Sequence, residues 1–254
     1  MIDESAFAAE DVQRLDNVLA DTSMPEVTRR GLLGKAAVGT AAIGAIGAFG
    51  PISSAFAAGS SSAIDEIVNA AVTAEALAIT YLTGLVENAH KIGIPSSLVP
   101  VLKAANAAEL DHYNVLRSLG AKPLTTKFWA PNKFFASSKD AFATLEYAET
   151  AFVNAYLIAV TAFAKAGKNS LARYAGEILG VESEHRTLAR FAQGKLPNNL
   201  AFESYAIHSI GGIVKSLEKA GVGFGQKGKG PGAFYHFAKP PHSALVRLEH
   251  NKPA

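Results

Sequence analysis

The chain contains no cysteine, and its two methionines lie at positions 1 and 24. The lack of cysteine excludes disulfides, thiolate metal sites and cysteine nucleophiles. Any bound metal must therefore use oxygen and nitrogen ligands, which suit iron, manganese or zinc.

Neither sign of charge dominates the chain, because 24 basic residues stand against 22 acidic ones. The first 57 residues hold seven of the acids and four of the bases, so only a small basic excess remains after them. This excess is too weak to predict binding to nucleic acid. Hydrophobic residues make up 49% and charged residues 18%, values typical of a globular chain with one substantial core.

The N-terminal segment has the features of an export signal. The sequence TRRGLLGK at 28–35 precedes an apolar run at 36–52, and Ala55 and Ala57 are the small residues that a signal peptidase requires. The alternative is a transmembrane anchor, but the many glycines and alanines make the run only weakly hydrophobic. The paired arginines resemble the twin-arginine signal, so we expect residues 1–57 to be removed.

This resemblance implies a route and a destination. Twin-arginine substrates pass through their translocase already folded, often with a cofactor loaded in the cytoplasm. The mature chain would then lie in the periplasm, the cell envelope or the extracellular space, with no stable membrane span. A buried metal site suits such a route.

Between residues 58 and 197 the sequence predicts four helices, each with a core-facing stripe at alternating steps of three and four residues. Each stripe is apolar except for one or two ionisable residues. The stripes are Ile64, Val68, Ala71, Glu75, Ala78, Leu82 and Leu85; Leu98, Leu102, Ala105, Glu109, His112, Leu116 and Leu119; Phe142, Leu145, Glu149, Phe152, Tyr156, Ala159 and Phe163; and Leu171, Ala175, Ile178, Glu182, His185, Ala189 and Ala192.

Two of these stripes carry a glutamate followed three residues later by a histidine, namely Glu109 with His112 and Glu182 with His185. Residues three apart lie on the same face of a helix, so each pair can share one ion. Burying unpaired carboxylates at core positions would cost several kcal/mol, and a metal removes that cost. A hydrogen-bonded core histidine and a boundary glutamate are the ordinary explanations for each residue alone. The six together favour metal.

Short breaks separate the helices within each pair, and a long segment joins the pairs. Gly93–Pro95 and Ala166–Asn169 are compact turns, which make their flanking helices antiparallel neighbours. Residues 121–137 have no helical pattern and hold Trp129 among other aromatics, for which packing over the core is expected. Their length suits a crossover along the bundle. We therefore predict an all-α fold, a four-helix bundle with a long crossover between helices 2 and 3.

The order of glutamates, histidines and crossover resembles the ferritin-like family over about residues 62–194. The resemblance implies two metal ions, iron or manganese, with oxygen or peroxide as reactants. Glu109 and Glu182 would bridge the ions, one histidine would bind each, and the remaining carboxylates would be terminal ligands. The implied ligands are Glu75, Glu109, His112, Glu149, Glu182 and His185.

The resemblance leaves several functions open. One is an oxidoreductase acting on ferrous ion, oxygen or peroxide, and a manganese catalase-like enzyme is a second. A non-enzymatic envelope protein that keeps the fold is a third. The resemblance also leaves open whether the chain forms a homo-oligomer.

Other polar residues near the ligands have ordinary explanations. Glu146 lies off the third stripe and is expected to face solvent, although a small rotation of the helix would exchange it with Glu149. Asp111 and Glu184 are expected to point outward. The tyrosines at 81, 113 and 156 could donate hydrogen bonds to the ligands or carry an electron, but packing is the expected role of each.

The segment 198–254 is predicted to be an extension with one helix and a tail. A helical pattern runs from Phe202 to Gly221 and is expected to pack on the bundle. The glycine- and lysine-rich residues 221–232 have little helix propensity and match a phosphate loop only superficially, so a flexible tail is expected. The histidines at 236, 242 and 250 are expected to be solvated.

Overall fold

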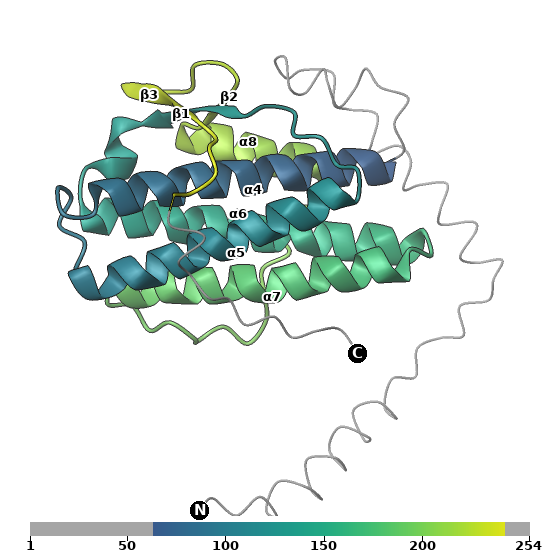
Figure 1. The fold of residues 1–254 in the computed structure, drawn as a ribbon. Helices are drawn as coiled ribbons and strands as arrows, with labels where there is room; N and C mark the ends of the chain where they lie inside the picture. The colour runs from purple at the N-terminus through teal and green to yellow at the C-terminus, as the bar shows by residue number, and fades with distance from the viewer. Residues whose placement is uncertain (1–62, 242–254) are drawn as a thin grey trace, which may run out of the picture. The chain divides into compact units, whose positions relative to one another are not determined.

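The structure is a computed structural model that describes residues 63–241. The predicted signal region, its cleavage site and the last histidines, at 242 and 250, lie outside this range. Within it, the four predicted helices are present in the expected order (Figure 1). They are α4 (Ala63–Asn88), α5 (Val99–Ser118), α6 (Ser138–Lys165) and α7 (Asn169–Ala192).

The helices pack in two antiparallel pairs, α4 with α5 and α6 with α7, and α4 also contacts α6. Short turns join the members of each pair, as the glycine and proline positions predicted. A 3-10 turn at Ser96–Leu98 leads into α5. The side chain of Ser137 caps α6, because its Oγ accepts a hydrogen bond from the backbone N–H of Asp140 at 3.1 Å. The prediction of an all-α bundle is confirmed.

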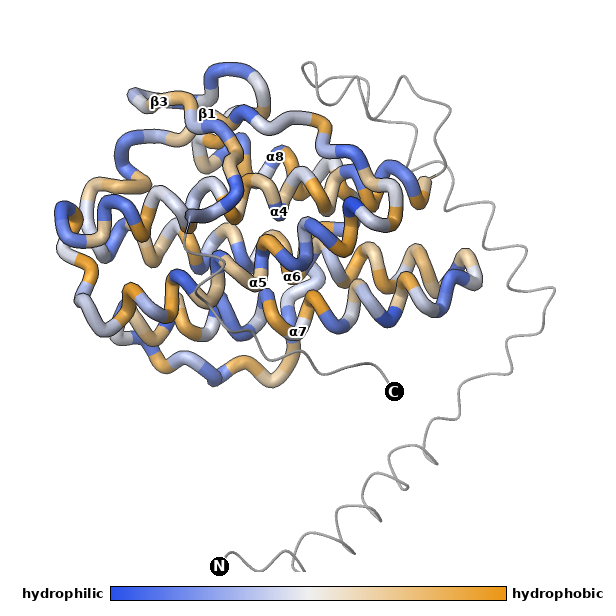
Figure 2. The backbone as a smooth tube through the Cα atoms, viewed as in Figure 1, coloured by the Kyte–Doolittle hydropathy of each residue, from blue (hydrophilic) through white to orange (hydrophobic). Residues whose placement is uncertain are grey.

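The core lies along the inward faces of these helices. Hydrophobic and hydrophilic residues recur along each of them in Figure 2, as expected for amphipathic helices. Helices α4 and α6 are long and apolar enough to cross a membrane by length and composition. Both supply central core residues, and Val72, Ile79 and Leu82 of α4 are fully buried. Burial in the bundle accounts for their apolar character.

The crossover runs along α4. Backbone N–H groups of Lys122 and Leu124 donate to the side chains of Asn69 and Thr73, at 2.7 and 2.9 Å. The chain then forms strand β1 (Lys127–Pro131) and a 3-10 turn at Asn132–Phe135. Trp129 is 8% exposed, so its expected packing role is confirmed.

The C-terminal extension folds back onto the crossover. Strands β2 (Gly223–Phe224) and β3 (Gly232–His236) pair with β1 on its two sides, which gives an antiparallel sheet in the order β2-β1-β3. Phe128 of β1 faces Phe224 on one side and Tyr235 on the other. The expectation of a flexible tail over residues 221–232 is therefore wrong.

Close backbone packing explains the glycines of this segment. A Cβ at Gly228 would lie 2.1 Å from the carbonyl oxygen of Gly221, and one at Gly223 would lie 2.2 Å from that of Gln226. Side chains at these positions would prevent the turn from closing beside Trp129. The low helix propensity of residues 221–232 therefore reflects a tight turn and not a flexible tail.

Helix α8 (Ile210–Ala220) connects the bundle to the sheet and packs on α6. The predicted helix was to start at Phe202, but that side chain is 90% exposed and α8 begins eight residues later. Asn154 of α6 fixes the approach to α8, since its Oδ1 accepts from the N–H of Ile207 and its Nδ2 donates to the same residue's carbonyl. Figure 1 shows α8 and the sheet beside α4 and α6, away from α7.

Candidate metal centre

The structure brings the six predicted ligand residues together in the centre of the bundle, from all four long helices. The four glutamates are almost completely buried, with exposures of 2% or less. The two histidines are 9% and 6% exposed. They form two overlapping clusters that share Glu109 and Glu182, and in each cluster one ligand atom from every residue lies within 4.8 Å of the others.

The first cluster consists of Glu75, Glu109, His112 and Glu182. Nδ1 of His112 lies 3.2 Å from Glu109 Oε2, 3.3 Å from Glu182 Oε1 and 3.7 Å from Glu75 Oε2. One imidazole nitrogen therefore faces carboxylates from three different helices. A nitrogen surrounded by oxygens in this way is typical of a site that closes around a cation.

The second cluster consists of Glu109, Glu149, Glu182 and His185. Nδ1 of His185 lies 2.7 Å from Glu109 Oε1 and 4.0 Å from Glu182 Oε2. The shorter contact lacks hydrogen-bond geometry, since both atoms are without a hydrogen-bond partner. The contact is an ion pair that does not meet hydrogen-bond geometry, so both atoms keep a position for a cation.

The site leaves buried polar atoms unsatisfied. Both carboxylate oxygens of Glu149 and of Glu182, Oε1 of Glu109 and Nδ1 of His185 have no hydrogen-bond partner. Native interiors rarely leave such atoms unpaired, since each costs about 1–3 kcal/mol. Two cations bound among the oxygens and the histidine nitrogens would satisfy them, so the donor set fits a dimetal site made of oxygen and nitrogen ligands.

Without a cation, protons stabilise this cluster. Burial raises the pKa of the Glu75 and Glu149 carboxyls well above the usual 4.5, and neighbouring carboxylates raise it further. Burial opposes the charge of both histidines, but the surrounding carboxylates hold their pKa above the usual 6.5. Burial likewise opposes ionisation of Glu109, whose pKa the two histidines nevertheless lower. A metal must therefore displace protons to bind.

Tyr156 of α6 belongs to the surroundings of the site. Its hydroxyl donates a hydrogen bond to Oε1 of Glu75, while Oε2 of the same carboxylate faces His112. For Tyr156 the structure favours the alternative to simple packing, a hydrogen bond to a ligand residue. Tyr156 lies on the same stripe as Glu149, and this position predicted that its side chain is buried. The sequence does not reveal that it contacts Glu75 of α4. For Tyr81 the hydroxyl instead lies near the backbone carbonyls of Phe134 and Ala141.

The acids beside the ligands lie outside the site. Glu184 is exposed, as expected, whereas Asp111 is half-buried. Glu146 is also separate from the site, but it does not simply face solvent. It is half-buried and pairs with Arg190 at 2.9 Å and with Lys195. It thereby links α6 to the end of α7.

An ion pair that the sequence did not predict lies next to His185. Arg186 is 5% exposed, and its guanidinium contacts both carboxylate oxygens of Glu203 in the segment after α7. Ser183 donates to the same carboxylate. This pair fixes the segment between α7 and α8 against the helix that carries two ligands.

Comparison with known families agrees with this geometry. The family model described as ferritin-like domain matches residues 65–195, just over half of the chain. The chain belongs to the ferritin-like family. The matched range includes all six residues of the candidate site and ends before α8, so the extension is outside it. No curated protein and no solved structure matches the chain.

Proposed function

We propose that this ferritin-like protein holds two metal ions, most readily iron, and oxidises ferrous iron with dioxygen or peroxide. The observation that carries the proposal is the sharing of Glu109 and Glu182 by both clusters. Two cations a few ångströms apart repel each other, and carboxylates that contact both reduce this repulsion. The buried, doubly shared pair supplies that contact.

The remaining ligands divide evenly between the two positions. Glu75 and His112 belong to one cluster only, and Glu149 and His185 to the other. Four carboxylates against two divalent ions give a neutral set, which makes burial of the whole site tolerable. Tyr156 orients Glu75 by donating to Oε1 and thus leaves Oε2 directed at the cluster.

Iron bound at such a site supplies one-electron redox chemistry. Two ferrous ions lose one electron each, and dioxygen with two protons accepts both electrons to give hydrogen peroxide. The carboxyls of Glu75 and Glu149, whose pKa values are raised, release their protons when metal binds.

We also propose that the protein works outside the cytoplasm. The support is the sequence alone, with the paired arginines at 29 and 30 and the small residues at 55 and 57. Loading of the site before export would explain why the ligands are so deeply buried. Detection of a cleaved chain that begins at residue 58 in the envelope fraction tests this, and a chain retained in the cytoplasm would contradict it.

Elemental analysis of the purified protein tests the metal site. The unaltered protein is expected to hold about two iron or manganese ions per chain. The double variant Glu109→Ala, Glu182→Ala is expected to hold none. Glu184→Ala, an exposed neighbour on the same helix, is the matched control and should bind like the unaltered protein.

Oxygen uptake with ferrous ion then tests the reaction. Uptake is expected in the unaltered protein and in Glu184→Ala, and not in the double variant. Manganese in place of iron, together with rapid disproportionation of peroxide, would instead indicate a catalase-like enzyme. No metal after reconstitution would refute the catalytic proposal.

A further inference from the structure

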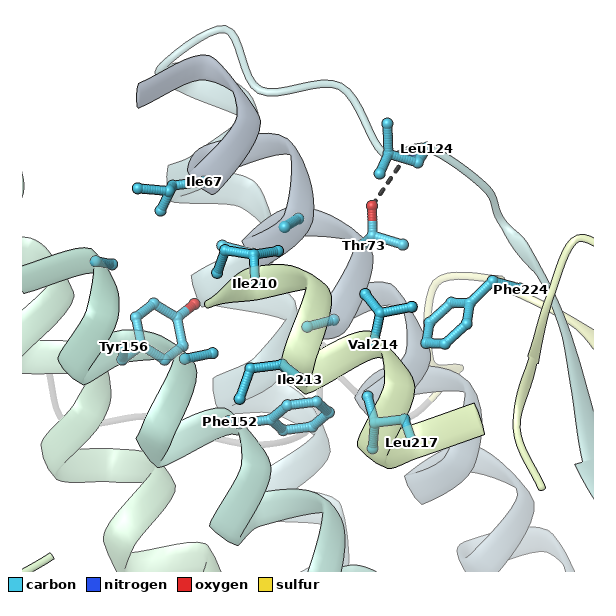
Figure 3. Close-up of a pocket in the computed structure, with 15 residues that line it drawn as sticks. Ile67, Thr73, Leu124, Phe152, Tyr156, Ile210, Ile213, Val214, Leu217 and Phe224 are labelled. Atoms are coloured by element: carbon cyan, nitrogen blue, oxygen red, sulfur yellow. Dashed lines mark hydrogen bonds between the residues drawn. The ribbon is translucent and has the colours of Figure 1, made fainter. Parts of the chain in front are cut away.

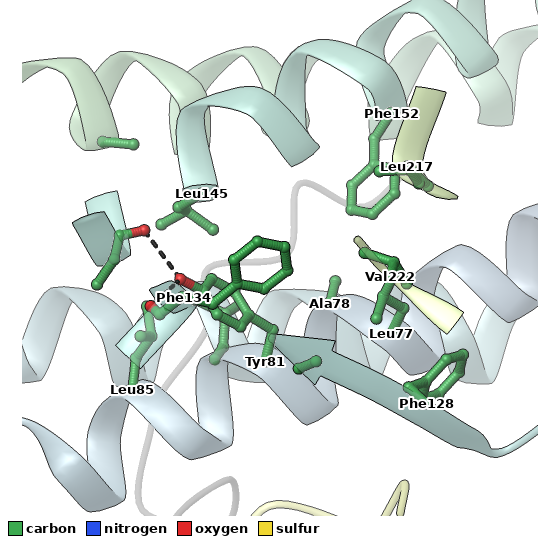
Figure 4. Close-up of a cluster of buried hydrophobic side chains, with 14 of the residues drawn as sticks. Leu77, Ala78, Tyr81, Leu85, Phe128, Phe134, Leu145, Phe152, Leu217 and Val222 are labelled. Atoms are coloured by element: carbon green, nitrogen blue, oxygen red, sulfur yellow. Dashed lines mark hydrogen bonds between the residues drawn. The ribbon is translucent and has the colours of Figure 1, made fainter. Parts of the chain in front are cut away.

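Two apolar cavities lie between the bundle and the C-terminal extension. The first, of about 50 Å³, is bounded by α4, α6 and α8 (Figure 3). All of its lining side chains are apolar except those of Thr73 and Tyr156. The second, of about 40 Å³, lies beneath the sheet and the end of α8, among the aromatic side chains of Phe128, Phe134 and Tyr81 that Figure 4 shows.

Each cavity reaches a residue of the metal centre. Tyr156, which donates to Glu75, lines the first cavity. Glu149 lines the second. Phe152 and Leu217 line both, so the two cavities are neighbours on either side of these two side chains. Together they reach both halves of the metal centre from the same side of the bundle.

The extension supplies the outer wall of both cavities. Ile213 and Leu217 of α8 and Phe224 of β2 close the first, and Leu217 and Val222 close the second. These four residues are at most 6% exposed. Without the extension, the corresponding faces of α4 and α6 would be open to water. The extension therefore encloses an apolar space beside the metal centre.

We propose that these cavities bind dioxygen and conduct it to the metal centre. An apolar cavity of about 150 Å³ stays dry and holds benzene, so a space of 40–50 Å³ suits a much smaller apolar molecule. Water and peroxide need several polar partners, which the first cavity offers only at Thr73 and Tyr156. Dioxygen needs none.

This inference deepens the proposed function and rests on it, because it selects dioxygen over peroxide as the oxidant. It also gives the extension a role in the reaction. The first cavity disfavours polar reactants, and the gas is concentrated next to Tyr156 and Glu149. Binding of the gas itself does not require metal, so the two proposals are separable by experiment.

The first experiment is NMR of the metal-free full-length protein under dioxygen pressure, with methyl-labelled side chains. Dissolved dioxygen is paramagnetic and speeds the relaxation of nearby protons. The methyls of Ile213 and Leu217 are expected to relax several-fold faster than those of Leu102, which is equally buried but lines neither cavity. Equal effects on the three residues would overturn the proposal, whether or not the protein oxidises iron.

The second experiment fills the first cavity. Ala155→Val adds methyl groups to its wall on α6, and Ala74→Val does so from α4. The control is Ala164→Val, at an exposed position of the same helix as Ala155. Overpacking destabilises a core, so the melting temperature identifies a variant that fails to fold. If one of Ala155→Val and Ala74→Val fails to fold, the other is used in its place.

In the metal-loaded protein, filling the cavity is expected to slow oxidation by dioxygen at least about fivefold, a change of about 1 kcal/mol in the barrier. Oxidation by added peroxide should change by less than about twofold, since peroxide does not use this route. The control should match the unaltered protein in both reactions. Equal slowing with both oxidants, or no slowing with dioxygen, would refute the proposed route.

Discussion

Replacement of Glu149 by leucine is expected to stabilise the metal-free protein and to reduce its stabilisation by metal. Glu149 is fully buried, and neither of its carboxylate oxygens has a hydrogen-bond partner. An unsatisfied buried polar group costs about 1–3 kcal/mol. Leucine removes that cost at similar size, so the free energy of unfolding without metal should rise by about 1–3 kcal/mol.

Bound metal is expected to reverse the order of stability of the variant and the unaltered protein. An ion that binds only the folded state at about 1,000 times its Kd adds about 4.1 kcal/mol of stability. The unaltered protein gains this at both clusters, whereas Glu149→Leu lacks one ligand of the second cluster and gains it only at the first. The variant should thus be the more stable protein with chelator and the less stable one with metal. For a chain of this size, 1 kcal/mol corresponds to about 2–4 °C in Tm.

Denaturant unfolding with chelator and with excess ferrous or manganous ion measures both effects. Leu145→Ala on the same stripe is the matched control, because it removes a buried apolar side chain and should cost about 2–5 kcal/mol in both conditions. If Glu149→Leu is less stable than the unaltered protein with chelator, the carboxyl has a structural partner and the reasoning fails. Equal gains from metal would also refute it.

Three further outcomes are expected. Tyr156→Phe removes the hydrogen bond to Glu75 and should weaken metal binding about 10- to 100-fold, as isothermal titration would measure, with little change in helix content by circular dichroism. The metal-free protein should lose stability as pH rises above about 4.5, and more steeply above about 6.5. Glu75, Glu149 and both site histidines have higher pKa values folded than unfolded, and they therefore bind protons more strongly in the folded state. Thermal unfolding across pH 4–8 with chelator would reveal the opposite slope if this is wrong. Asn154→Ala removes both hydrogen bonds to Ile207 and should lower the unfolding free energy by about 1–3 kcal/mol. Faster amide exchange in α8 than in α4 should accompany that loss, and unchanged exchange in α8 would contradict the anchoring role.

The spacing of ionisable residues in the sequence predicted which side chains meet in the bundle. Glu75, Glu149 and the two Glu-x-x-His pairs occupy stripe positions, and a stripe position is determined by helix periodicity within a few turns. Glycine and proline likewise predicted the ends of the long helices. These are local properties, so one sequence suffices to identify them.

The sheet and the tyrosine contact depend on partners that are far away in the chain. Strand β1 pairs with residues about 100 positions later, and β2 has only two residues, so neither has a periodic pattern of its own. The glycines at 223 and 228 are needed because neighbouring backbone atoms leave no room for a Cβ, and the sequence does not identify those atoms. Tyr156 was placed inside the bundle correctly, but its bond to Glu75 depends on how α4 and α6 pack.

The position of β1 at the centre of its sheet has a consequence for where this protein can be divided. The family match ends at residue 195, and a chain ending there would lose β2 and β3 together. Both sides of β1 would then present unpaired backbone groups next to the apolar side chains of Phe128 and Trp129, the kind of edge that templates aggregation. The smallest unit that folds cleanly therefore extends through His236, well beyond the ferritin-like domain.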